Sequence, residues 1–174
     1  MKALFVGRND YPVKKGGDGV QIEAYKIILL QNGHEVFFYN EIKDIDEIDV
    51  VHFFNIDRIY DLLEVRRKFA KGNKIFILHS IHQNYEYLKN IKKIVKNYTQ
   101  ISITIPENVK FIIRSIKAGI FNLSMLRYLF LKKNEGIIKL IDEIDYFHFL
   151  SDTECSWFEK DYNIKINMPA SFQK

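Results

Sequence analysis

Short runs of apolar residues alternate along the chain with longer segments whose apolar positions recur every three or four residues. The short runs occupy residues 2–6, 36–39, 49–54, 75–78 and 146–150. Short continuous apolar runs are typical of strands that are buried on both faces, and a spacing of three or four is typical of helices. The alternation predicts an α/β fold in which a parallel sheet carries helices on both faces.

The segments with helical spacing cover residues 19–31, 57–71, 85–97, 109–131 and 137–144. Gly72 ends the second of these helices, and Gly119 is a candidate break within the fourth. Two more β-type stretches, 101–105 and 164–168, are short and lie next to Pro106 and Pro169. Because no tract rich in Pro, Gly or Ser divides the chain, residues 1–174 are predicted to form one domain.

Capping signals mark the ends of two helices. Asp18 is the predicted N-cap of the first helix, with Gln21 completing a capping box three residues later, and Gly33 offers the left-handed residue that ends it. Ser151 and Glu154 form the same capping pattern at the start of a helix that follows the last main strand.

Composition bears on the class of protein and on its location in the cell. Of its 174 residues, 47% are hydrophobic, which is enough for a buried core, and no apolar run approaches the length of a membrane-spanning helix. The one cysteine, Cys155, excludes an internal disulfide and favours a reducing cytoplasm as the location. Cys155 has no evident base partner and is interpreted as an inert thiol.

Positive charge is concentrated in one part of the chain. The net charge is +4, yet residues 107–133 contain six cations and a single acid, so the remainder is slightly acidic. Lys110, Arg114 and Lys117 would share one face of a helix. This stretch is either a solvated helix face or an interfacial helix that contacts an anionic membrane from the cytoplasmic side. Nucleic acid is disfavoured as a partner because no known binding module is present.

The segment Lys14–Val20 (KKGGDGV) lies between the first strand and the first helix. Paired glycines allow the backbone to approach a ligand closely, and a helix N-terminus behind them favours a phosphate. Gly16, Gly17, Asp18 and Gly19 are therefore the candidate phosphate-binding residues; the alternative is a plain glycine-rich turn. The dinucleotide fingerprint and the P-loop pattern are both absent.

Five histidines are candidates for chemistry. His79 and His82 follow the strand at 75–78, at the edge where open α/β sheets bind ligands. The same edge rule predicts that the loop at Gly16 and Gly17 faces this edge, with His79 and His82 close by. His34, His52 and His148 are interpreted as structural. No Cys or carboxylate cluster completes a metal site around His79 and His82, so no metal is expected.

Several segments, in order, resemble the opening of family 4 glycosyltransferases of the GT-B fold. They are the Gly16-Gly17 loop before the first helix, Gly33-His34-Glu35-Val36 at the second strand, Asp49–Asn55 (DVVHFFN) at the third, Leu78-His79-Ser80 after the fourth, and Phe149-Leu150-Ser151 with Glu154. Asp18 and Ser80 depart from the pattern, because a small or apolar residue and an Asp are usual at these positions.

The resemblance implies that residues 1–174 are a single Rossmann-like domain, the N-terminal, acceptor-side half of a retaining glycosyltransferase. Such an enzyme moves a sugar from a UDP- or GDP-sugar to a glycan or lipid-linked acceptor, as in cell envelope polysaccharide synthesis, without a cofactor or metal. By this resemblance Gly16 and Gly17 would contact the diphosphate, His79 would lie at the reacting centre, and Asn55 and His82 would contact substrate.

The same resemblance places a donor-binding domain after Lys174, so the 174-residue chain is expected to be inactive alone. Two other interpretations stay open. One is a non-catalytic α/β binding or interaction module that shares only the architecture. The other is an acceptor subunit that acts in trans with a separate donor-domain chain.

Overall fold

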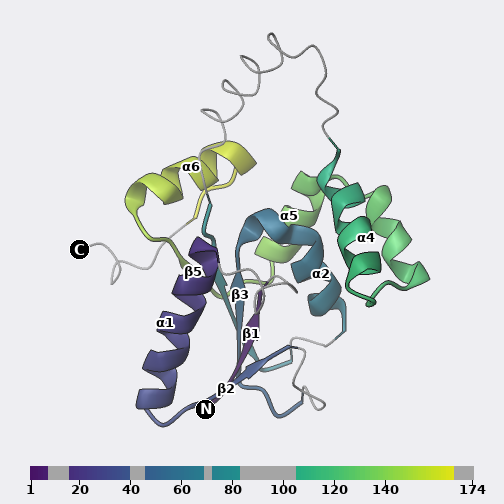
Figure 1. The fold of residues 1–174 in the computed structure, drawn as a ribbon. Helices are drawn as coiled ribbons and strands as arrows, with labels where there is room; N and C mark the ends of the chain where they lie inside the picture. The colour runs from purple at the N-terminus through teal and green to yellow at the C-terminus, as the bar shows by residue number, and fades with distance from the viewer. Residues whose placement is uncertain (8–15, 40–45, 69–71, 83–104, 167–174) are drawn as a thin grey trace.

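The computed structural model describes residues 1–7, 16–39, 46–68, 72–82 and 105–166 (Figure 1). Five strands form one sheet in the order β2-β1-β3-β4-β5, and every neighbouring pair is parallel. The strands are β1 (Lys2–Val6), β2 (Glu35–Phe38), β3 (Val50–Phe54), β4 (Ile75–His79) and β5 (Tyr146–His148). The predicted α/β fold class is confirmed, with strand ends displaced by two residues at most.

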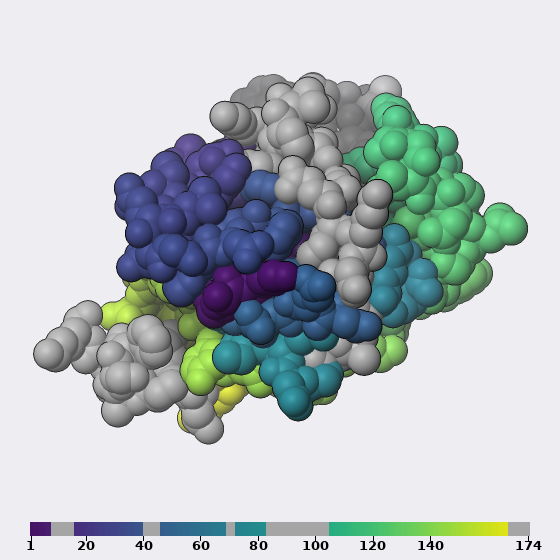
Figure 2. Space-filling model, turned by 90° about the horizontal axis from the view of Figure 1, so that it is seen from below, coloured from purple at the N-terminus to yellow at the C-terminus, as the bar shows by residue number. Residues whose placement is uncertain are grey.

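The strands are linked by helical segments. They are α1 (Gly17–Gln31), η1 (Ile56–Arg58), α2 (Ile59–Arg67), α4 (Glu107–Lys117), η2 (Leu123–Leu129), α5 (Lys133–Ile141) and α6 (Asp152–Tyr162), where η denotes a 3₁₀ helix. Figure 1 shows α1 on one side of the sheet and α2, α4 and α5 on the other. In Figure 2, seen from below, α1 and the green α4 region again lie on opposite sides of the start of β1.

Alternation along the strands divides the core into two unequal parts. Leu4, Val51 and Phe76 face the larger part, where they pack with side chains of α2, α4, α5 and α6. Phe5 and Phe54 face the smaller part, which packs against Ile22 of α1. Because β1 and β3 contribute buried residues to both parts, these two strands have the continuous apolar pattern of a doubly covered parallel sheet.

The predicted N-cap of the first helix is wrong. α1 begins at Gly17 with Gly16 as its N-cap, and Asp18 lies inside the first turn. The predicted end is correct, because Gly33 has φ 75°, its N–H donates to Leu30 O, and the His34 N–H donates to Leu29 O. These two bonds are a Schellman motif, which satisfies the last carbonyls of the helix.

Gly119 interrupts the long helix predicted over 109–131. It has φ 68°, so α4 ends at Lys117 and the chain continues as the 3₁₀ segment η2. The predicted helix over 57–71 is η1 followed by α2, and residues 69–71 lie outside the described residues. Residues 164–166 do not form the predicted last strand. The helix predicted over 85–97 and residues 101–104 of the next stretch also lie outside the described residues.

Candidate functional site

Three chain segments meet at the carboxyl edge of the sheet. The Asn55 N–H, just after β3, donates to His79 O at 3.0 Å, and the Ser80 N–H, just after β4, donates to His148 O at 3.2 Å. Asn55 Nδ2 reaches Asp18 Oδ2 at 3.4 Å, which brings the first turn of α1 to the same place. The structure therefore gathers Asp18, Asn55 and His79, three of the residues singled out from the sequence.

The N-terminus of α1 is open at Gly17. Gly17 is exposed, its φ is not positive, and a Cβ added there would meet no atom within 4 Å. Neither backbone conformation nor packing among the described residues therefore requires a glycine at this position. A glycine at the positive end of a helix does permit close approach by an external anion.

Asp18 occupies part of that helix terminus. Its side chain is buried, with 6% exposed. Oδ1 accepts from the Gly19 N–H at 3.0 Å, and Oδ2 accepts from Asn55 Nδ2. The carboxylate thus lies where the helix dipole favours negative charge, and it links α1 to the loop after β3. An incoming phosphate at this terminus would meet a carboxylate neighbour.

Asn55 holds the loop after β3 in a left-handed conformation. Its φ is 68°, and its side-chain oxygen accepts from the Asp57 N–H at 3.2 Å. Asparagine suits both tasks, because it tolerates positive φ and its short amide bonds to the backbone two residues later. The same side chain then uses its nitrogen to bind Asp18.

His52 and His79 form a buried pair on adjacent strands. His52 Nδ1 lies 2.8 Å from His79 Nε2. Both residues are buried, with exposed fractions of 6% for His52 and 2% for His79. Burial lowers the pKa of His52 to about 4. Burial, with the neighbouring His52 and His148, lowers the pKa of His79 to about 2. Both rings are therefore neutral near pH 7, and one nitrogen of the contact donates while the other accepts.

The second ring nitrogen of His79 lacks a partner. Its Nδ1 is buried and has no hydrogen-bond partner among the residues that the structure describes. Leaving a buried polar atom unsatisfied costs about 1–3 kcal/mol, so such an atom requires an explanation. A polar ligand at this edge of the sheet would supply the missing partner.

Tyr25 of α1 covers this imidazole pair. Its ring centroid lies 4.4 Å from that of His79, and its hydroxyl is 3.0 Å from Nε2 of His148 on β5. Sequence reasoning does not single out Tyr25, because a tyrosine at an apolar position of a helix is typical of core packing. His148, read as structural, is half-buried and belongs to the same aromatic cluster.

His82 lies in a separate acidic environment. It is 4% exposed; Nε2 is 3.0 Å from Asp161 Oδ2 on α6, and Nδ1 is 3.7 Å from Asp57 Oδ1. Burial acts to lower its pKa, but hydrogen bonding to the two carboxylates outweighs burial and raises it. Lys133 also contacts Asp57, with Nζ 2.9 Å from Oδ1. His82 is thus enclosed by protein groups and is less accessible to substrate than the sequence suggested.

Glu154 forms hydrogen bonds with the segments that follow β4 and β5. Its Oε1 accepts from the His82 N–H at 2.6 Å and from the Ser80 hydroxyl, and its Oε2 accepts from the Leu150 N–H at 2.7 Å. The predicted cap is confirmed in one half only, because the Ser151 hydroxyl accepts from the Glu154 N–H at 3.1 Å, whereas the Glu154 carboxylate binds elsewhere. Ser80, which departs from the family pattern, is one of its partners.

Between Ser80 and His82 the backbone is strained. Ile81 has φ 45°, which is an unfavourable conformation for a β-branched residue. Such strain persists where surrounding contacts impose it, and here the bonds of Glu154 to both neighbours of Ile81 do so. The bonds of Glu154 therefore hold the turn between Ser80 and His82 in this conformation.

No metal centre is formed in the described ranges. Within them, no group of three His, Cys, Asp or Glu side chains could hold a metal ion. His79 bonds to His52, while His82 bonds to carboxylates, so the two do not converge on one point. Burial and nearby acids raise the pKa of the Cys155 thiol, which keeps it protonated.

The predicted cationic face of α4 is largely neutralised. Lys110 Nζ lies 2.8 Å from Glu107 Oε1, and Arg114 lies 3.4 Å from both Glu107 and Asp61. The membrane hypothesis required three exposed, unpaired cations, and two of them are in ion pairs. Within the described ranges, no helix combines the length and the apolar character that crossing a membrane demands.

Comparison of the chain with family models, with curated proteins and with solved structures finds no match.

Proposed function

We propose that residues 1–174 are the acceptor-side half of a retaining glycosyltransferase that uses a UDP- or GDP-sugar. The proposal is supported by the ordered sequence segments that resemble family 4 enzymes and by the position of these segments in the fold. Three of them, at Gly17, Asn55 and His79, come together at the carboxyl edge of a parallel sheet. This edge is where open α/β sheets bind ligands.

One observation carries the proposal. The exposed, sterically unrequired Gly17 and the unpartnered Nδ1 of buried His79 lie at the same edge of the sheet. The first allows a phosphate to approach a helix N-terminus, and the second leaves a polar atom to be satisfied. A nucleotide sugar contains both a diphosphate and hydroxyl groups, so it would meet both requirements.

Each residue then has a distinct task. The N-terminus of α1 at Gly16 and Gly17 would offer N–H groups and its dipole to the diphosphate. Neutral His79 would exchange a hydrogen bond with the transferred sugar or with the attacking hydroxyl, and His52 holds its ring in place. Asn55 positions Asp18 at the start of α1, and His82 organises the turn after β4 through Asp57 and Asp161.

A non-catalytic α/β module is the second candidate, and a specific observation favours it. The Asp18 carboxylate occupies the α1 terminus, and His79 is only 2% exposed. A protein without a phosphate ligand would satisfy its helix terminus with its own carboxylate in this way. The two candidates differ in whether a nucleoside diphosphate binds at Gly17.

Titration of the ¹⁵N-labelled chain with UDP and with GDP tests the difference. If the proposal holds, amide signals of Gly17 and Gly19 and the ring signals of His79 shift with one common Kd. Gly17→Val should abolish these shifts, because its side chain fills the approach to the helix terminus. Gly33→Ala, at the opposite end of α1, should leave them unchanged even though it lowers stability.

The proposal is rejected if neither nucleotide shifts the signals of Gly17 and His79, or if Gly17→Val binds as well as the unmodified chain. Thermal unfolding of each variant, measured in parallel, shows that a loss of binding is not a loss of folding. Absence of binding in a folded chain would leave the non-catalytic module as the function.

A further inference from the structure

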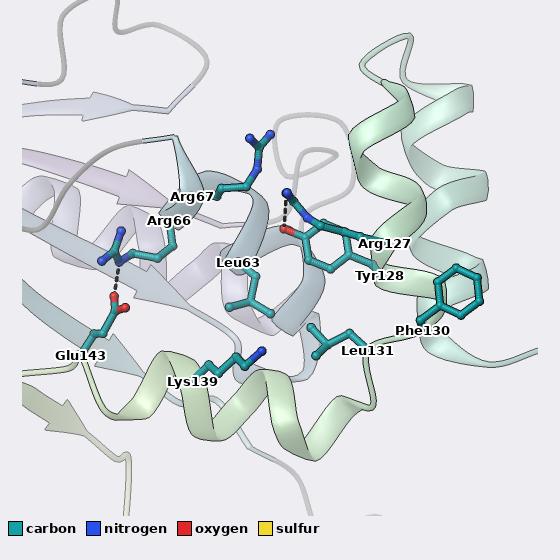
Figure 3. Close-up of a pocket in the computed structure, with 9 residues that line it drawn as sticks. All are labelled: Leu63, Arg66, Arg67, Arg127, Tyr128, Phe130, Leu131, Lys139 and Glu143. Carbon is teal, nitrogen blue, oxygen red and sulfur yellow. Dashed lines mark hydrogen bonds and ion pairs between the residues drawn. The ribbon is translucent and has the colours of Figure 1, made fainter.

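A cavity lies on the outer helical layer, apart from the candidate site. It has a volume of about 550 Å³ and is formed between α2, η2 and α5 (Figure 3). Leu63, Arg66 and Arg67 lie in the second half of α2, Lys139 lies in the second half of α5, and Glu143 follows the end of α5. Both helices run away from the carboxyl edge at these positions, since each leads toward the beginning of the next strand. The cavity is therefore distinct from the candidate site at Gly17 and His79.

The inner wall of the cavity is apolar. Leu63 of α2 and Leu131, which follows η2, lie beside the ring of Tyr128 (Figure 3). Phe130 stands at the outer side with 87% of its surface exposed. A phenylalanine so exposed gains little from burial in the fold, and its ring is available for contact with a molecule at the outer rim of the cavity.

Cationic side chains surround this apolar wall. Arg66, Arg67, Arg127 and Lys139 line the cavity, while the carboxylates near them are Glu143, in the lining, and Glu64 beneath it. Four cations against two carboxylates leave an excess of two positive charges. Lys139 is exposed and has no ion-pair partner among the residues that the structure describes.

Buried Glu64 fixes the two central guanidinium groups. Its Oε1 is 2.8 Å from Arg67 Nη2, and its Oε2 is 3.0 Å from Arg127 Nη2. Burial acts to raise the pKa of Glu64, but Arg67 and Tyr128 outweigh this and lower it, so the carboxylate stays ionised. A guanidinium carries five N–H donors, and the bonds to Glu64 use few of them. Both arginines, 42% exposed, are thus held in place with donors left for an anion.

We propose that this cavity binds a small organic anion that has a flat apolar body and one carboxylate or phosphate group. The body would lie against Leu63 and Leu131 with Phe130 at the outer rim, and the anionic group would take hydrogen bonds from Arg67, Arg127 and Lys139. The volume falls within the range of small-molecule sites, and a few convergent polar groups on an apolar wall are typical of them. Arginine suits such an anion because its planar fork binds two oxygens at once.

Calorimetric titration with 1-naphthyl phosphate and 1-naphthoate tests the proposal on the whole chain. We expect a Kd in the sub-millimolar range for at least one of them, given roughly 13 to 15 non-hydrogen atoms per ligand. Inorganic phosphate, which lacks the apolar body, and 1-naphthol, which lacks the charge, should each bind about tenfold more weakly. Comparison of the two anions shows whether carboxylate or phosphate is preferred.

Two variants locate the binding. Phe130→Ala and Lys139→Gln should each weaken binding several-fold, because the first removes an aromatic contact and the second removes a positive charge. Neither residue holds another in place, so folding is retained. Leu123→Ala, on the same segment as Phe130 and 78% exposed, and Lys117→Gln, an exposed cation outside the cavity, are matched controls that should bind normally.

The proposal is overturned if both anions fail to bind, if inorganic phosphate binds as tightly as they do, or if Phe130→Ala and Lys139→Gln bind like the controls. Unchanged amide signals of Arg67 and Arg127 during a saturating titration would also reject it, because the ligand would then lie elsewhere. None of these results bears on nucleotide binding at Gly17, so the two proposals fail independently.

Discussion

At the scale of single residues, the central feature is a set of buried polar groups at the carboxyl edge of the sheet. His52 and His79 share one contact, and both are held neutral by burial. Glu154 is also buried, but its two oxygens accept bonds from three separate donors. The histidine pair leaves Nδ1 of His79 without a partner among the described residues, whereas both carboxylate oxygens of Glu154 accept hydrogen bonds.

The imidazole pair makes stability depend on pH. Since folding lowers both pKa values below the ordinary 6.5, the unfolded chain binds more protons, and stability is lost as pH falls below 6.5. Between pH 6.5 and 5 the loss should be about 1–2 kcal/mol for each imidazole. His82, whose pKa folding raises, has the opposite effect, so it partly offsets this loss as pH falls through 6.5.

Urea unfolding at several pH values from 5 to 6.5 measures this effect. The double variant His52→Phe with His79→Phe should show a clearly flatter dependence than the unmodified chain, and the control His34→Asn, at the start of β2, should not. An equal slope in the double variant would show that these imidazoles are not held neutral by the fold.

Replacing Glu154 tests whether its hydrogen bonds stabilise the fold. In Glu154→Gln one oxygen becomes an NH₂ group, which cannot accept from the Leu150 N–H and leaves that donor unpaired. We expect a loss of about 2 kcal/mol in the free energy of unfolding. Asp152→Asn changes an exposed carboxylate in the first turn of the same helix and should cost much less. Equal losses would mean that the bonds of Glu154 are not stabilising.

At the scale of elements, glycines decide where helices end. Gly33 and Gly119 have φ 75° and 68°, and each completes a Schellman motif at the end of α1 or α4. A left-handed residue with a Cβ costs roughly 1–2 kcal/mol, which explains why the chain has glycine there. Gly17 is different because it begins α1 without a positive φ.

Two alanine variants, one at each end of α1, separate the glycine that needs a positive φ from the glycine that does not. Gly33→Ala should lower the free energy of unfolding by about 1 kcal/mol through backbone strain. Gly17→Ala should raise it by about 0.5 kcal/mol, because alanine reduces the freedom of the unfolded chain and meets no neighbour in the folded one. Chemical denaturation of both variants checks the signs. If Gly17→Ala is as destabilising as Gly33→Ala, the helix N-terminus has a conformational need for glycine.

At the scale of the whole molecule, the candidate site lies along one edge of the sheet. The proposed transfer reaction needs donor groups facing Gly17 and His79 from the other side of a cleft, as the family resemblance implies. The described residues form a single sheet with its helices, and the phosphate contacts proposed at this edge come from the N-terminus of α1. Chemistry at this edge would therefore depend on a second domain or subunit.

The 174-residue chain should consequently show no measurable sugar transfer. UDP- and GDP-sugars incubated with it should remain intact, whereas the same chain joined to, or mixed with, a donor-binding domain should turn them over. Release of UDP or GDP, measured by chromatography, follows the reaction. Turnover by the purified chain alone would show that the proposed division of labour is wrong.

The sequence by itself determined the class of fold, because strand-like and helix-like periodicities are local and repeat along the chain. It also determined the ends marked by Gly33, Gly119 and Ser151, where the residue type satisfies a local backbone need. Strand direction also correctly indicated that His79 lies at the same edge of the sheet as the first turn of α1, because segments that follow parallel strands gather at one edge.

Only the tertiary structure decided which polar groups meet. Asp18 became a partner of Asn55 instead of an N-cap, Glu154 bound the ends of two strands, and His82 was enclosed by Asp57 and Asp161. The cavity near Phe130 is formed by residues of α2, η2 and α5, and the spacing of apolar residues in the sequence does not indicate that these elements meet. These contacts join residues far apart in the chain, and their geometry depends on how the helices pack, which local patterns do not specify.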